Sequence, residues 1–247
     1  NGVELGATPP ELSAGTDLII QNNIISVNTN GTANSAYMAF VEGSATLASG
    51  KCSHAEGGGT SAIGTYAHAE GVDTKAAGEE SHAEGWGTVA SGHNSHAEGN
   101  YTTAAGVNSH AEGYQTLASG YVAHAEGYRT SAIGQYTHTE GQNTIANNDC
   151  AHAEGQYTSA LKMMTHAEGQ GTIANGYCSH AEGFYTKSSG DSSHTEGQYT
   201  SATMDASHAE GGWTIANANY SHAEGHRTSA LGYASHAEGD FTIAGTY

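Results

Sequence analysis

The chain has 247 residues and a formal net charge of −19, from 6 basic and 25 acidic side chains. Nucleic acid and anionic lipid are excluded as partners because a chain this acidic repels them, and no apolar run is long enough to insert into a membrane. Hydrophobic residues make up 36% of the chain, which is low for a globular core, but their spacing is too regular for a disordered protein.

Residues 1–39 contain no repeat and form the first predicted segment. Pro9-Pro10 predicts a linker or a turn. Two short isoleucine-rich runs within residues 17–27 flank Asn22-Asn23, a pattern that predicts a β-hairpin. Because a stack of repeats needs a cover over its first unit, we expect residues 1–39 to be an N-terminal cap or connector.

Residues 40–247 repeat every fourteen residues in about fifteen copies, the last incomplete. Numbered from its first residue, the repeat reads His-x-Glu-Gly at positions one to four, with Phe40 replacing histidine in the first copy. Position seven is always threonine, and position nine is alanine except at Ser188. A period without insertions means that each unit stacks on the one before.

Each repeat has room for two short strands and two turns, which predicts an all-β fold, a parallel β-solenoid with one coil per repeat. Side chains alternate across a strand, so alanine, serine and threonine should face the interior while histidine and glutamate face outward. An interior this thin buries too little apolar area to be stable alone. Positions eight and ten usually carry one aliphatic residue between them, which alternates from coil to coil, as in Ile133, Ile145 and Leu161; this suggests packing against a partner surface.

The threonine column shares its predicted face with alanine and glycine. We therefore expect the threonines to point into the coil rather than to form an exposed ice-binding ladder. Cys52, Cys150 and Cys178 occupy one repeat position. The nearest two are two coils apart, about 9–10 Å, which is too far for a disulfide. We predict three free thiols, which leave the cellular compartment open.

The sequence Asn-Ser-His-Ala-Glu-Gly at residues 94–99 and 108–113, followed by Thr-x-Ala-x-Gly, resembles the fourteen-residue repeat of YadA-like adhesin heads. The resemblance covers residues 40–247. That family forms left-handed parallel β-rolls that associate as trimers in bacterial surface adhesins, and similar repeats occur in phage tail fibres. The resemblance therefore implies a trimeric, left-handed β-roll.

In the adhesin heads, the two outward positions of the first strand are commonly valine and isoleucine facing the trimer centre, whereas here they are histidine and glutamate. The resemblance implies that three histidines and three glutamates per layer line the axis. The predicted trimer-interface residues are His54, Glu56, His68, Glu70, His82, Glu84, His96, Glu98, His110, Glu112, His124, Glu126, His138, Glu140, His152, Glu154, His166, Glu168, His180, Glu182, His194, Glu196, His208, Glu210, His222, Glu224, His236 and Glu238.

The His–Glu pair has a structural and a chemical interpretation. A buried carboxylate is costly unless it is paired, and an imidazole of a neighbouring chain would satisfy it. The same pair could ligate a divalent metal, but metal sites are normally single and tailored. We therefore expect a structural role, no metal and no other cofactor. Fourteen equal copies also argue against an enzyme, because a catalytic site is normally a unique departure from its scaffold.

Exposed aromatic side chains on turns can stack on sugars or anchor a protein partner. They can equally brace neighbouring coils or subunits. The predicted receptor-binding residues, all at positions five and six, are Trp86, Tyr101, Tyr114, Tyr128, Arg129, Tyr157, Phe184, Tyr185, Tyr199, Trp213 and Arg227.

Together these features predict a structural and attachment segment of a trimeric extracellular fibre, about 70 Å long, that binds a surface glycan or a protein receptor. A phage or phage-like tail fibre is favoured by the short non-repeat start and by the lack of a coiled-coil stalk or membrane anchor. The first alternative is a bacterial cell-surface adhesin head that binds host matrix. The second is a metal- or pH-responsive solenoid, whose histidine column would dissociate the trimer on protonation.

Overall fold

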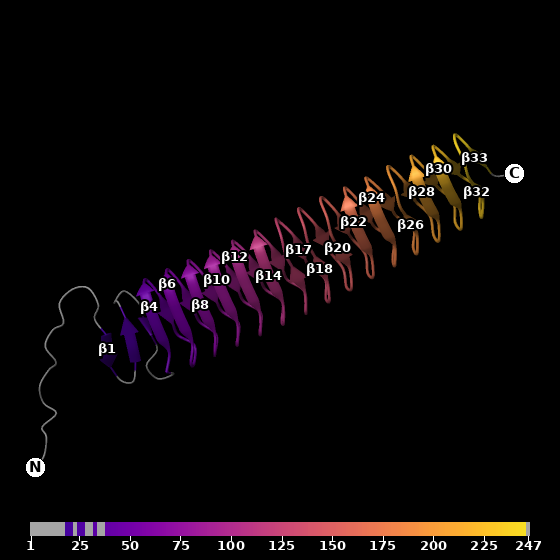
Figure 1. Ribbon diagram of the computed structural model, residues 1–247. Coiled ribbons are helices and arrows are strands. Elements are labelled where there is room, and N and C mark those ends of the chain that lie inside the picture. Colours follow the sequence, from indigo (N-terminus) through magenta and orange to yellow (C-terminus); the bar gives the residue numbers. More distant parts are fainter. Residues whose placement is uncertain (1–17, 22–23, 28–31, 34–37, 246–247) are drawn as a thin grey trace, which may run out of the picture.

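The computed structural model describes residues 18–21, 24–27, 32–33 and 38–245, the first three ranges as backbone only. The described residues form strands and turns without a helix, so none of them belongs to an apolar helix of membrane-spanning length. From β4 onward the chain winds into a single straight rod (Figure 1). The predicted all-β parallel solenoid, with fourteen residues per coil, is confirmed.

Two ladders of strands run along the rod, one on each side of the coil. The first sheet consists of β1 (Leu18–Gln21), β2 (Ile24–Val27), β4 (Phe40–Ser44), β6 (His54–Gly58), β8 (His68–Val72), β10 (His82–Trp86), β12 (His96–Asn100), β14 (His110–Tyr114), β16 (His124–Ala125), β18 (His138–Thr139), β20 (His152–Ala153), β22 (His166–Gln170), β24 (His180–Phe184), β26 (His194–Thr195), β28 (His208–Gly212), β30 (His222–His226) and β32 (His236–Ala237).

The second sheet is made of two-residue strands. It consists of β3 (Thr32–Ala33), β5 (Leu47–Ala48), β7 (Ser61–Ala62), β9 (Lys75–Ala76), β11 (Val89–Ala90), β13 (Thr103–Ala104), β15 (Leu117–Ala118), β17 (Ser131–Ala132), β19 (Ile145–Ala146), β21 (Ser159–Ala160), β23 (Ile173–Ala174), β25 (Lys187–Ser188), β27 (Ser201–Ala202), β29 (Ile215–Ala216), β31 (Ser229–Ala230) and β33 (Ile243–Ala244).

The register is the same in every coil of the array. From β4 onward each strand pairs in parallel with the equivalent strand of the next coil, so His82 lies beside His96 and Glu84 beside Glu98. Both ladders extend upstream of residue 40, because β2 pairs in parallel with β4 and β3 with β5. β1 and β2 are antiparallel, with Gln21 opposite Ile24. Residues 1–17, which include Pro9-Pro10, lie outside the described residues.

The core is a narrow column of small side chains, as the alternation predicts. Ala125 and Ala132 are fully buried, one from each sheet, and Thr130 is buried beside them. The threonines therefore face the interior, and no flat threonine ladder is displayed on the described surface. All three cysteines are free thiols, as predicted.

Glycine at position four is required by the stacking of the coils. Gly113 has a φ of +105°, and a Cβ on it would overlap the backbone carbonyl oxygen of Gly127 in the next coil. An L-residue is strained at that φ and would also push two coils apart. This explains why the repeat never varies at this position.

Candidate functional site

The outward face of the first sheet carries two parallel columns, one of imidazoles and one of carboxylates. In β12, the buried Ala97 separates His96 from Glu98, so both polar side chains point away from the core. The in-register pairing repeats this arrangement in every coil. The predicted face of these residues is thus confirmed, whereas their place in a trimer remains a prediction.

The histidine rings form one continuous stack from His54 to His236. Neighbouring ring centroids are 4.7–4.9 Å apart and the ring planes are within 19° of parallel. Burial, followed by repulsion from the neighbouring imidazoles, lowers the pKa of His152 to about 4. Burial likewise lowers the pKa of six other histidines in the stack: His54, His82, His110, His124, His180 and His208. These imidazoles are therefore neutral at pH 7.

The imidazoles approach the glutamates without hydrogen-bonding to them. Within a coil, the shorter separations between His Nε2 and Glu Oε2 are 3.7–4.0 Å, longer than a hydrogen bond. Nε2 of His124 is buried and has no hydrogen-bond partner among the described residues. The same is true of Nε2 in most histidines of the stack. An unpaired buried polar atom is costly, so this face of a single chain leaves polar groups that a further surface could satisfy.

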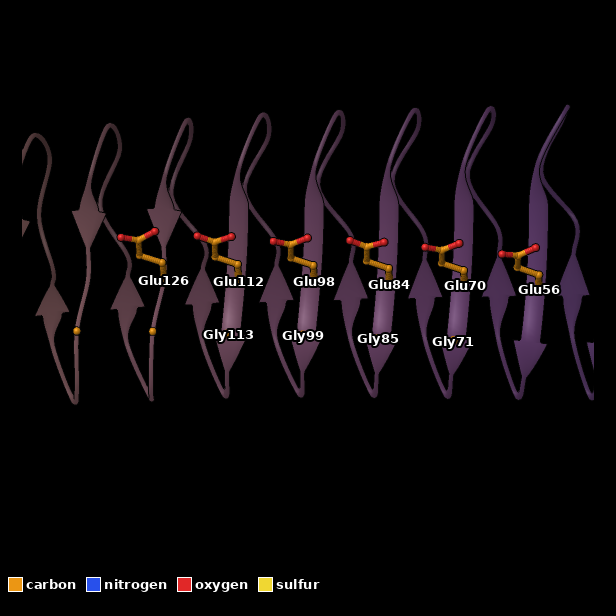
Figure 2. Close-up of a pocket in the computed structure, with 12 residues that line it drawn as sticks. Glu56, Glu70, Gly71, Glu84, Gly85, Glu98, Gly99, Glu112, Gly113 and Glu126 are labelled. Atoms are coloured by element: carbon orange, nitrogen blue, oxygen red, sulfur yellow. The ribbon is translucent and has the colours of Figure 1, made fainter.

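The glutamates line a shallow groove along the rod. One stretch has a volume of about 770 Å³ and is lined by Glu56, Glu70, Glu84, Glu98, Glu112 and Glu126 and by glycines of the same column from Gly71 to Gly141. Figure 2 shows these carboxylates in a single row. A second stretch of about 570 Å³ is lined by Glu154, Glu168, Glu182 and Glu196.

The carboxyls of the groove perturb one another's pKa values. Side-chain hydrogen bonds to Glu70 and Glu98, with burial and repulsion between carboxylates, raise the pKa of Glu84 to about 7. A hydrogen bond to a neighbouring glutamate is also the main cause that raises the pKa of Glu112, Glu154, Glu182 and Glu210 to about 7. The same bonds lower the pKa of the alternate members Glu70, Glu98, Glu126, Glu168, Glu196 and Glu224. Raised and lowered pKa values therefore alternate along much of the column, and the raised members lose their protons near neutral pH.

Several neighbouring side chains are close enough to share a metal ion. In groups such as His152, Glu154 and His166, one ligand atom from each residue lies within 4.8 Å of the others. Imidazole and carboxylate suit zinc or a similar divalent ion. However, such groups recur along the rod, as at His208, Glu210 and His222 or at Glu56, His68 and Glu70, so nothing distinguishes one of them as a tailored centre.

The predicted receptor-binding residues lie at the end of the first strand of each coil or on the turn that follows it. All are exposed except Phe184, which is half-buried. The structure brings ten of them into three groups, and Tyr157 makes no aromatic or cation–π contact with another described residue. Trp86 packs near Tyr101, and Tyr114 stacks on Tyr128, whose ring also receives the guanidinium of Arg129. The third and longest group contains Phe184, Tyr185, Tyr199, Trp213 and Arg227.

Sequence reasoning missed the backbone conformation of both turns. Every described residue at positions six and thirteen has a positive φ, which is 51–60° where the residue is not glycine. The αL region costs an L-residue roughly 1–2 kcal/mol. Glycine and asparagine tolerate αL, so Gly87, Asn94 and Asn143 in these columns were the signal that could have predicted the positive φ. The other residues at positions six and thirteen are too varied to show a preference for αL.

One protein family matches this chain. The model of the YadA head domain repeat, which spans two copies, matches residues 83–109, 97–123, 111–137, 125–147 and 223–244. The resemblance seen in the sequence is confirmed over these segments. No curated protein matches the chain.

Proposed function

Because this chain carries YadA-like head repeats, we propose that it is the structural and attachment segment of a trimeric extracellular fibre. The observation that carries the proposal is the uniform thin coil. Its core of alanine, threonine and serine continues along the whole rod, and the described residues contain no unique reactive centre. Such a coil gains little from burial alone and is stabilised by association along its length.

The outward face of the first sheet is the proposed trimer interface. Its histidines and glutamates are about two-thirds buried even in one chain; the side chains of His124 and Glu126 are 37% and 33% exposed. The unpaired His Nε2 atoms and the protonated carboxyls supply hydrogen-bonding groups for the same columns of two further chains. Neutral imidazoles and half-protonated carboxyls lower the electrostatic cost of bringing three such faces together.

Sedimentation equilibrium at neutral pH, with and without a chelator, tests this assembly. We expect the mass of three chains in both conditions. A single-chain mass would refute the trimer and would leave the His–Glu face in water. A three-chain mass that falls on chelation would instead favour the metal-responsive alternative, for which the recurring His–Glu–His groups are the supporting observation.

The fibre belongs, in this proposal, to a phage or phage-like tail, where it binds a surface glycan or protein receptor. A bacterial cell-surface adhesin head that binds host matrix is the alternative. Electron microscopy with gold-labelled antibodies against the rod distinguishes the two locations. Label on virion fibres supports the first, and label on the surface of bacterial cells supports the second.

A further inference from the structure

The longest aromatic group continues over five consecutive coils at position six. We call Tyr185, Tyr199, Trp213, Arg227 and Phe241 the turn ladder. Ring centroids are 5.6 Å apart between Tyr185 and Tyr199 and 5.4 Å apart between Tyr199 and Trp213. The guanidinium carbon of Arg227 lies 5.8 Å from the Trp213 ring and 5.1 Å from the Phe241 ring. Aromatic and cationic side chains thus form an unbroken strip along one edge of the rod.

The backbone does not favour these residues at this position. Tyr199, Trp213 and Arg227 all have a φ of 55°, whereas glycine occupies the same column at Gly87 and Gly171 and meets the turn without strain. The strained turn is held by inter-coil hydrogen bonds, such as Trp213 N to Gln198 O at 2.8 Å. Four bulky rings and one arginine in five successive αL positions therefore lower stability, which points to contact with a ligand as their role.

The guanidinium of Arg227 makes no ion pair with any described residue. The chain has 25 acidic residues, yet no carboxylate of the described residues lies within ion-pair distance of this guanidinium. Asp240, in the next coil, pairs with His226 instead, with 2.8 Å between Nδ1 and Oδ1. The edge therefore combines flat apolar rings, unpaired guanidinium donors, tyrosine hydroxyls and an exposed carboxylate acceptor.

We propose that the turn ladder binds a neutral oligosaccharide that lies along the rod axis. The C–H faces of sugar rings would lose contact with water on Tyr199 and Trp213, and Arg227 and Asp240 would hydrogen-bond the hydroxyls. The charge of −19 disfavours a polyanion, so the glycan is neutral rather than acidic. This inference rests on the attachment function proposed above and names the ligand class.

Calorimetric titration of the assembled protein with neutral hexasaccharides of glucose, mannose, galactose and N-acetylglucosamine tests the proposal, with a uronic-acid hexasaccharide as the acidic comparator. We expect one neutral probe to bind. Tyr199→Gly and Trp213→Gly should each weaken that binding by roughly tenfold or more. The matched control is Tyr220→Gly on the opposite turn, whose φ of 60° and 59% exposure are similar; it should leave binding unchanged.

The same glycine variants separate binding from bracing, because glycine relieves the αL strain. If the rings serve binding, Tyr199→Gly and Trp213→Gly lose affinity while their melting temperature stays the same or rises. A lower melting temperature with unchanged affinity would overturn the proposal, as would binding restricted to the acidic probe or to none. A three-chain rod that adheres to cells but ignores all neutral probes would overturn this inference alone, and the fibre function would stand.

Discussion

Glu84 and Glu98 are register partners in adjacent coils of one carboxylate column, and hydrogen bonding within the column, from Glu70 and Glu98 to Glu84 and from Glu112 and Glu84 to Glu98, moves their pKa values in opposite directions. The pKa of Glu84 rises to about 7, whereas that of Glu98 falls below its usual value. One proton held between two carboxyls removes the repulsion that two adjacent negative charges would cause. The rod can therefore stack a glutamate in every coil.

The stability of the rod should rise as the pH falls from about 8.5 to about 6.5. The raised pKa of Glu84 means that its contribution is fully present below pH 4.5, the ordinary value, and is lost as the pH rises through about 7. The same pH dependence is expected from the other glutamates whose pKa is raised to about 7, which are Glu112, Glu154, Glu182 and Glu210. Melting followed by circular dichroism should show the rise, and a flat profile would contradict shared protons.

Stability should fall again in acid. The fold favours the neutral form of histidines such as His152. Their contribution to stability is therefore lost as the pH falls from 6.5 through about 4. The lowered pKa of Glu98 adds a contribution that is present above pH 4.5 and is lost below it. Between pH 6.5 and 4.5 the loss from the histidines opposes the gain from Glu84. Sedimentation at about pH 3.5, below the pKa of His152, tests the pH-responsive alternative, because an unchanged mass there would count against a histidine switch.

Replacing alternate glutamates with glutamine should stabilise the rod at alkaline pH. Glu84→Gln combined with Glu112→Gln makes the protonated state permanent at two positions, so melting at about pH 8.5 should rise and its pH dependence should weaken. The control is Glu79→Gln, because Glu79 lies outside the column and contacts His93 at 3.5 Å. An equal effect of the control would refute a role specific to the column.

The His–Glu pair should tolerate joint replacement better than single replacement. His124→Val with Glu126→Ile removes two polar groups together, which should be neutral or stabilising at the proposed interface. Either change alone leaves the other polar group unpaired and should cost about 1–3 kcal/mol. Thermal melting of the three variants, with sedimentation to check assembly, measures this. Single changes without effect would contradict pairing between the columns.

Gly113→Ala should destabilise the rod by about 2 kcal/mol or more, because it adds overpacking to backbone strain. Its Cβ would overlap the carbonyl oxygen of Gly127 at a φ of +105°. Gly58→Ala is the matched control: a Cβ there meets nothing within 4 Å, so the change should stay within about 0.5 kcal/mol. Urea unfolding measures both. Similar losses in the two variants would show that crowding does not explain the glycine column.

Much of the fold followed from local pattern. The fourteen-residue period implies identical coils, and strand alternation places Ala97 inside with His96 and Glu98 outside, because neither inference requires knowledge of the third dimension. The αL turns were not foreseen. Trp213 and Arg227 are unusual at positive φ, and the conformation there is imposed by hydrogen bonds to the preceding coil.

The sequence by itself determined the repeat, the interior and outward positions and the columns of like residues. Only the tertiary structure decided how members of a column act on one another: whether Glu84 and Glu98 share a proton, how far His124 lies from Glu126, and whether Trp213 contacts Arg227. These interactions join residues a coil or more apart, or two outward side chains of one strand. They depend on the rise of the coil and the direction of each side chain, which the order of residues along the chain does not contain.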